Sequence, residues 1–382
     1  MAVTFVGTGG TYFGIWITNL LLMIVTLGLY YPWARVRKLQ FFASNTVIGD
    51  YPMHFHGVPR RMFGGFLLAV LAFLIYTVAD NLHPLLGLAA MLVFGLLWPL
   101  LLRAALRFRL GNSSWRGLRL AFTGTTSGAY RAVGLPLAAL ALMATLVTAS
   151  LAVVYALGSG TEIDGASALA PWVSIVPAFT LLVLMALIPN IHYRVTRYRQ
   201  ENLRYASERA RFEAGPAGFY MIYGLTIGSA LLVLALIAWV MYLVSAGREI
   251  GQIFEAESGI GAAVLMLIIV IGIVAWHLAR STFEALIFNL VWNNTRSEHL
   301  VCEARLSLLG LWFVRLTNSI LIALTLGLYT PFAQVRLARL QRRALSIETR
   351  IAIDGLIADA KRDQLSAASD AAADLFDLDL GL

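Results

Sequence analysis

The sequence predicts an all-α polytopic membrane protein with about six full transmembrane helices, on three observations. Hydrophobic residues make up 59% of the 382 residues and charged residues only 13%. Mean hydropathy is +0.76, which is outside the balance of soluble domains. Apolar stretches near the roughly 20 residues that cross a bilayer lie at 64–79, 84–102, 131–157, 170–189, 217–245 and 259–278. Two further apolar segments, near 12–31 and 309–330, share an interrupted motif.

That motif is Thr-Leu-Gly-Leu-Tyr, followed two residues later by proline. The copies begin at Thr26 and Thr325, so the offset from 26 to 325 is 299 residues, and no gap interrupts the match. Each copy contains residues that break helices: Gly28 and Pro32, and Gly327 and Pro331. A membrane tolerates such breaks only where protein or water receives the freed backbone groups. We therefore expect two broken, re-entrant terminal segments.

The distribution of Lys and Arg predicts the orientation. Nearly all of them fall in the loops near 32–63, 103–130, 190–216, 279–308 and 332–382. The intervening turns near 80–83, 158–169 and 246–258 contain only Arg248. Basic loops stay on the cytoplasmic side, so the net charge of +8 is mainly an orientation signal, and no nucleic-acid partner is expected. Both termini are cytoplasmic if the terminal segments re-enter, whereas two ordinary spans would give eight full spans.

A fixed spacing of proline, asparagine, phenylalanine and glycine predicts internal repeats. Its members are Pro32, Asn45, Phe55 and Gly57; Pro99, Asn112, Phe122 and Gly124; and Pro189, Asn202 and Phe212, with Ala214 at the glycine position. We expect the asparagines to form caps or turns rather than bind a ligand. The predicted units of a single membrane domain (1–354) are 1–57, 58–124, 125–215, 216–304 and 305–354, the last matching the first. A mobile acidic cytoplasmic tail, 355–382, follows.

Short cytoplasmic β-strands are expected between the basic helices and the F-x-G positions. Residues 47–56 show the two-residue alternation of a half-buried strand. Several such segments predict a small cytoplasmic sheet.

The first 57 residues resemble a known family. They read F-x-G-x-G-x-x-Y-F, then N-L-L-L-x-x-x-T-L-G-L-Y-x-P-W-A-R-x-R, then N-T-x-I-G. This pattern is similar to the YjgN-like family of bacterial inner-membrane proteins, which is catalogued as a domain of unknown function. The resemblance implies a multi-pass protein of the bacterial inner membrane, and it supplies no catalytic residue. The second copy departs from the first, because Gln334 replaces Arg35 and Phe332 replaces Trp33, which argues against an essential symmetric role at those positions.

Several kinds of chemistry are not expected. The single cysteine, Cys302, excludes an intrachain disulfide and a cysteine-rich zinc site. His54 and His56 share one strand face, where a solvated or hydrogen-bonded pair is favoured over a metal site. No P-loop, Rossmann, HExxH or GxSxG motif is present. We therefore expect no enzyme, cofactor or metal, and the few ionisable groups within the central spans argue against an ordinary proton-coupled transporter.

The candidate path residues lie in the two repeated segments: Thr18, Asn19, Thr26, Tyr30, Arg315, Thr317, Asn318, Thr325 and Tyr329. In one interpretation the copies face each other across a pseudo-twofold axis and line a path for a small solute, ion or lipid. In the other, these groups only join helices and Arg315 snorkels. The alternative function is a non-catalytic scaffold whose basic cytoplasmic layer binds anionic lipid headgroups or a partner protein. A membrane-embedded enzyme is third, and membrane lipids and a homo-oligomer are the expected partners.

Overall fold

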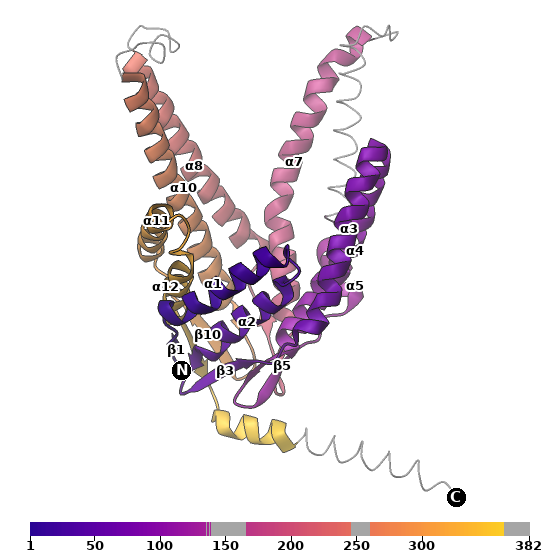
Figure 1. The fold of residues 1–382 in the computed structure, drawn as a ribbon, viewed down its shortest axis with the longest axis vertical. Coiled ribbons are helices and arrows are strands. Elements are labelled where there is room, and N and C mark those ends of the chain that lie inside the picture. Colours follow the sequence, from indigo (N-terminus) through magenta and orange to yellow (C-terminus); the bar gives the residue numbers. More distant parts are fainter. Residues whose placement is uncertain (135, 137, 139–165, 246–259, 363–382) are drawn as a thin grey trace, which may run out of the picture.

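The computed structural model is mostly helical (72%) and describes residues 1–134, 136, 138, 166–245 and 260–362. Long helices diverge on one side of a layer of short strands (Figure 1). The helices are α1 (Gly9–Val25), α2 (Tyr31–Ser44), α3 (Pro59–Leu82), α4 (Pro84–Gly111), α5 (Thr126–Ala129) with the π-helical turn η1 (Tyr130–Gly134), α7 (Ala166–Glu201), α8 (Pro216–Ser245), α10 (Ile260–Asn293), α11 (Leu308–Leu324) and α12 (Thr330–Arg343). Proline opens α3, α4 and α8, a position where its missing N–H has no helical partner to lose.

Within the described residues, five helical segments are long and apolar enough to cross a membrane. They are Pro59–Leu82, Leu85–Gly111, Ala178–Glu201, Pro216–Trp239 and Ala262–Asn293. The predicted stretch 131–157 falls mostly outside the described residues. The structure thus agrees with a helical membrane protein, and α1 and α11 are shorter apolar helices.

Short strands are present, as predicted, and the pairings among the described strands are antiparallel. They are β1 (Val3–Phe5), β2 (Thr46–Ile48), β3 (Tyr51–Phe55), β4 (Ser113–Trp115), β5 (Leu118–Phe122), β6 (Leu203–Tyr205), β7 (Glu208–Arg209), β8 (Arg211–Phe212), β9 (Thr295–Arg296), β10 (Leu300–Ala304) and β11 (Leu345–Thr349). One sheet runs from β1 to β7, and the other joins β8, β9, β10 and β11.

The two sheets meet at both ends and so form a strand ring. At one junction, only Ala210 separates β7 from β8, and its N–H donates to the carbonyl of Leu203 in β6 (2.9 Å). At the other junction Ala2 bridges Ser346, and the N–H of Ile347 donates to the carbonyl of Met1 (2.9 Å). Ring closure covers the strand edges that would otherwise pair with other chains.

Each basic helix is followed by the same local geometry. The side-chain amide of Asn45 donates to the carbonyl of Phe41 (2.8 Å), and that of Asn112 donates to the carbonyl of Phe108 (2.7 Å). The same two carbonyls also accept the backbone N–H of the asparagine (both 3.2 Å), so the side chain adds a second hydrogen bond at the helix end. At Gly124, a Cβ would lie 2.5 Å from the Phe122 ring, so the F-x-G turn requires a close approach there.

Both TLGLY copies reverse the chain in the same way. Leu27 and Leu326 both have φ of 49°, and the glycines that follow them have φ of 88° and 94°. In the first copy, the Thr26 hydroxyl donates to the carbonyl of Leu22 (2.6 Å) and accepts from the N–H of Tyr30 (3.0 Å). The matching bonds of Thr325 are 2.7 and 2.9 Å. Each copy is therefore a helix–turn–helix unit, which we call a TLGLY hairpin.

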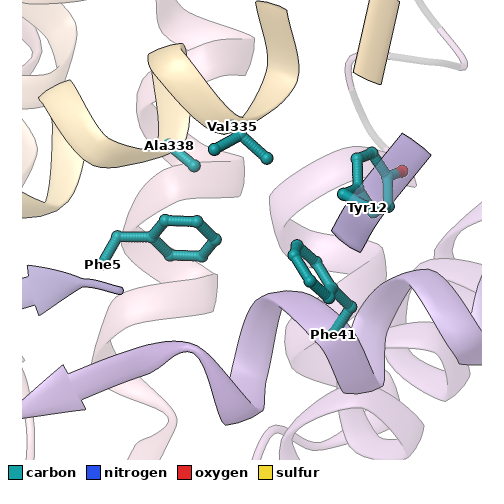
Figure 2. Close-up of a cluster of buried hydrophobic side chains, with 5 residues drawn as sticks. All are labelled: Phe5, Tyr12, Phe41, Val335 and Ala338. Carbon is teal, nitrogen blue, oxygen red and sulfur yellow. The ribbon is translucent and has the colours of Figure 1, made fainter. Parts of the chain in front are cut away.

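The two TLGLY hairpins meet head to tail through α1 and α12. Their contact contains the buried side chains of Phe5, Tyr12, Phe41, Val335 and Ala338 (Figure 2). The helices α11 and α10 pack as the next pair along the chain. In the interpretation with a pseudo-twofold axis, α2 would meet α11 as α1 meets α12, and the described residues show no comparable contact there. Neighbouring hairpins instead follow one another around the strand ring.

The departures between the two copies follow from their different neighbours. Phe332 of the second copy contacts Phe13 (5.7 Å between ring centroids), and the hydroxyl of Tyr12 donates to Gln334 (3.2 Å). The matching Trp33 contacts Phe63 at the start of α3 (5.5 Å). The substitutions thus mark the junction between the chain ends.

A helix formed by residues 353–362 packs beside the strands. Ile357 and Ala360 are buried against Leu118 of β5, and Asp354 forms an ion pair with Arg116. The first residues of the predicted mobile tail are thus helical and packed, and 363–382 lie outside the described residues.

Replacing Phe5 with alanine is expected to loosen the junction between the chain ends. Phe5 is only 4% exposed, and removing a buried phenylalanine costs about 3–5 kcal/mol. The control is Val6→Ala, because Val6 is 60% exposed. Thermal unfolding of the purified protein in detergent, followed by circular dichroism, should show a clearly lower midpoint for Phe5→Ala only. Equal midpoints would contradict this role.

Candidate functional site

Most predicted path residues hold the TLGLY hairpins together. Thr18 and Thr317 donate to carbonyls of their own helices (both 2.8 Å). The side-chain amide of Asn19 donates to the carbonyl of Ala34 (3.5 Å), and that of Asn318 donates to the carbonyl of Ala333 (3.3 Å). These bonds cross from the first to the second helix of each hairpin, which favours the helix-joining interpretation.

The two copies differ in the hydrogen bonding of the side-chain oxygen of this asparagine. The Oδ1 atom of Asn318 accepts from Arg336 (2.8 Å), which also donates to the hydroxyl of Tyr329 (3.4 Å). In the first copy the matching Arg37 lies over the ring of Tyr30, 5.7 Å from its centroid. The buried Oδ1 of Asn19 has no hydrogen-bond partner in the described chain.

Arg315 is the candidate residue whose surroundings differ most from expectation. Its guanidinium forms an ion pair with Glu284 of α10, and the amide of Gln341 in α12 donates to the same carboxylate (2.9 Å). The Arg315 side chain is only 11% exposed, so it joins three helices rather than snorkelling. Glu284 was missed because the sequence placed 279–308 in a loop, whereas α10 continues to Asn293.

The carboxylate of Glu284 also lines a hollow of about 390 Å³ beside α10. The other lining residues are Arg199 from α7, and Arg280, Phe283, Ile287, Phe288, Val291 and Trp292 from α10. We call it the α10 hollow. Its lining combines an apolar helix face with charged groups, which is typical of a site for small molecules that are partly apolar.

Two of the lining residues, Arg199 and Arg280, are cationic, and each lies within electrostatic reach of a further arginine. The positive charge of Arg109 in α4 repels those of Arg199 and Arg342. In the same way, the charge of Arg280 repels that of Arg315. Burial, with repulsion from Arg109, lowers the pKa of Arg342 in α12. Across the described residues, no ion pair involves Arg109, Arg199, Arg280 or Arg342. This arrangement suits an anion, because guanidinium groups bind phosphate and carboxylate oxygens in a bidentate manner.

His54 lies in β3 and His56 directly after it, and His56 contacts a side chain of β4. The rings of His54 and His56 lie 6.2 Å apart, and the Nε2 of His56 lies 2.8 Å from the hydroxyl of Ser114. No group of three metal-ligating side chains occurs among the described residues.

Comparison with known proteins supplies the family. The family model described as "Bacterial protein of unknown function (DUF898)" matches residues 1–375. The chain belongs to this family. The predicted resemblance is confirmed by curated relatives named "Inner membrane protein YjgN". No solved structure shows a significant match.

The relatives match only part of the chain. The Salmonella typhimurium strain LT2 protein is 32% identical over 127 residues, which is 31% of this chain and 31% of that protein. The Escherichia coli strain K12 protein is 26% identical over 186 residues, or 48% of this chain and 43% of that protein. Each match therefore spans less than half of the relative's length. Together with the long apolar helices, these names support an inner-membrane protein of an uncharacterised family.

Removing the carboxylate of Glu284 is expected to destabilise the contact among α10, α11 and α12. Glu284→Ala leaves the Arg315 guanidinium buried without its partner, a change that costs about 2–4 kcal/mol for a pair of intermediate burial. The double variant with Arg315→Leu should recover part of the loss, because no charge is then stranded. The exposed pair of Glu303 and Arg305 supplies the control, Glu303→Ala. Additive losses in a double-mutant cycle, measured by chemical unfolding, would contradict the coupling.

Proposed function

We propose that both TLGLY hairpins dip into the membrane from the side of the strand ring and return to it. At the tips, Leu27 is 94% exposed and Leu326 is 95% exposed, and Val25 and Leu324 beside them are also largely exposed. Leucine and valine at a water-exposed tip would be unfavourable, whereas lipid accommodates them. The 17 residues of α1 rise about 25 Å, less than the roughly 30 Å hydrocarbon core.

In this proposal the strand ring and both described ends of the chain are cytoplasmic. The basic helices α2 and α12 lead directly into strands β2 and β11, and basic segments stay on the cytoplasmic side. The five long apolar helices would then cross the membrane, and the further span predicted at 131–157 lies mostly outside the described residues.

Single-cysteine labelling in intact cells tests this topology. With Cys302 replaced by serine, a membrane-impermeant maleimide should label Asn81→Cys, at the end of α3, from outside. Gly10→Cys and Ser346→Cys should react only after permeabilisation, and Leu27→Cys should stay protected by lipid. Labelling of both Gly10→Cys and Ser346→Cys from outside would instead support eight full spans.

We further propose that the protein handles an anionic lipid or a small anionic solute in the α10 hollow. One observation carries this proposal: Arg199 of α7 and Arg280 of α10 line the hollow, and neither forms an ion pair within the described chain. Uncompensated charges in a partly buried site repel one another, and a bound anion removes that repulsion. The apolar α10 face beside them favours a ligand with an acyl or aromatic part. The site lies beside α10 rather than between the TLGLY hairpins.

A scaffold function is the second candidate, and exposed charge on the strand ring favours it. Arg119, Arg204 and Arg209 are exposed there. On the cytoplasmic side these groups would face anionic headgroups, which attract basic residues near the surface.

Neutralising the hollow separates the two candidates. Arg199→Gln and Arg280→Gln should each weaken binding of dioctanoyl phosphatidylglycerol to the purified protein by roughly tenfold, the effect of one charge-assisted hydrogen bond. Arg305→Gln is the control, because its side chain is 87% exposed and lies elsewhere. The same variants should slow the movement of a fluorescent anionic lipid across liposomes. If only Arg119→Gln and Arg204→Gln reduce lipid binding and no movement occurs, the scaffold candidate replaces the first.

A further inference from the structure

Buried polar atoms without partners gather on α10 and α11. In the described chain five buried side-chain atoms lack a hydrogen bond, and four of them belong to these two helices. They are Nδ1 of His277, Oγ of Ser281, Nε1 of Trp312 and Nε of Arg315. The nitrogens of Trp312 and Arg315 can only donate. A buried donor without a partner costs free energy comparable to a lost hydrogen bond, so a shared cause is needed.

These four residues belong to two helices that pack against each other. His277, Ser281 and Glu284 follow at helical spacing along one face of α10, and Trp312 and Arg315 lie three residues apart on α11. Arg315 reaches Glu284 directly and acts electrostatically on His277. One turn beyond Ser281, Ala285 is fully buried against α11.

Ser281 and Trp312 lie 13 residues before and 18 residues after Asn294, and the repeat places Pro99 and Tyr130 in the same way about Asn112, and Pro189 and Tyr220 about Asn202. The tyrosines at these matching positions have protein partners. The hydroxyl of Tyr130 donates to the carbonyl of Leu96 (2.8 Å), and the hydroxyl of Tyr220 donates to the carbonyl of Ala186 (2.9 Å). Each acceptor lies three residues before a proline, Pro99 or Pro189, and proline distorts the preceding turn. In α10 the matching residue is Ser281, which is fully buried, and the donor of Trp312 is left free.

We infer that His277, Ser281, Trp312 and Arg315 form a subsite for a phosphate oxyanion. The N–H groups of Trp312 and Arg315 and the hydroxyl of Ser281 supply its hydrogen bonds. The charges of Arg280 and Arg315 exceed that of Glu284 by one, which suits a singly charged phosphate. The source is either the headgroup of a phospholipid or free inorganic phosphate.

Of the two arginines that line the α10 hollow, Arg280 also contributes its charge to this subsite, whereas Arg199 belongs to the hollow alone. The subsite also touches the α10 hollow through Glu284, which lines the hollow and holds Arg315 in place. The two sites can therefore fail separately.

The test uses the full-length protein in detergent, titrated with dioctanoyl phosphatidic acid, inorganic phosphate and dioctanoyl phosphatidylcholine by calorimetry. Ser281→Ala and Trp312→Phe should each weaken binding of the occupying phosphate by about tenfold, as loss of one hydrogen bond to a charged group does. The matched controls are Ser229→Ala, whose hydroxyl bonds within its own helix, and Trp276→Phe, which is 64% exposed. Both controls should bind as the parent does.

The outcomes distinguish the sources and the two sites. Binding of phosphatidic acid alone assigns a lipid headgroup, whereas binding of inorganic phosphate assigns the free ion. If no phosphate probe binds, or if Ser281→Ala and Trp312→Phe bind normally and unfold at a higher temperature, the donors face water or a void and the inference is overturned. Loss of phosphatidylglycerol binding in Arg199→Gln, with phosphate binding intact in Ser281→Ala and Trp312→Phe, overturns the subsite and leaves the proposed function standing.

Discussion

The architecture depends on the pairing of the first residues with the last strand. Met1 and Ala2 align with Ser346 and Ile347 through backbone hydrogen bonds, and this contact joins the two ends of the strand ring. Without it, β1 and β11 would each present a free edge. The pairing also brings α1 against α12, because each helix connects to a closing strand through only a short turn or loop. The buried cluster around Phe5 then adds apolar burial to this junction.

Closure of the strand ring explains why the two TLGLY hairpins pack against different helices. The first TLGLY hairpin lies between α12 and α3, and the second lies between α10 and α1. Similar turns thus have different neighbours. Phe332 and Gln334 contact α1, whereas Trp33 contacts α3 and Arg35 donates to Tyr31 of its own helix. The second hairpin alone receives a carboxylate from α10, and the Arg315–Glu284 pair forms there. An asymmetric polar site thus arises within a repeated framework.

The charge distribution separates structural from functional groups. Asparagine and threonine side chains complete helix ends and turns, so their hydrogen-bonding capacity is largely used. The arginines around the α10 hollow have no carboxylate partners in the described chain, and buried donors remain free between α10 and α11. Because unpaired buried polarity is unfavourable, its concentration in one region makes that region the best candidate for a ligand.

The sequence by itself determined the membrane class, the short strands, the two interrupted segments and the family. These follow from local chemistry: long apolar runs, two-residue alternation, and glycine and proline at fixed spacing. The sequence did not reveal that Met1 lies beside Ile347, because these residues are at opposite ends of the chain. It also did not reveal that Glu284 faces Arg315, because Glu284 was assigned to a loop and not to α10. The electrostatic influence of Arg109 on Arg199 and Arg342 likewise joins three helices that are far apart in the sequence. Only tertiary structure decides which separated helices share a neighbour, since local spacing fixes the face of a helix but not its partner.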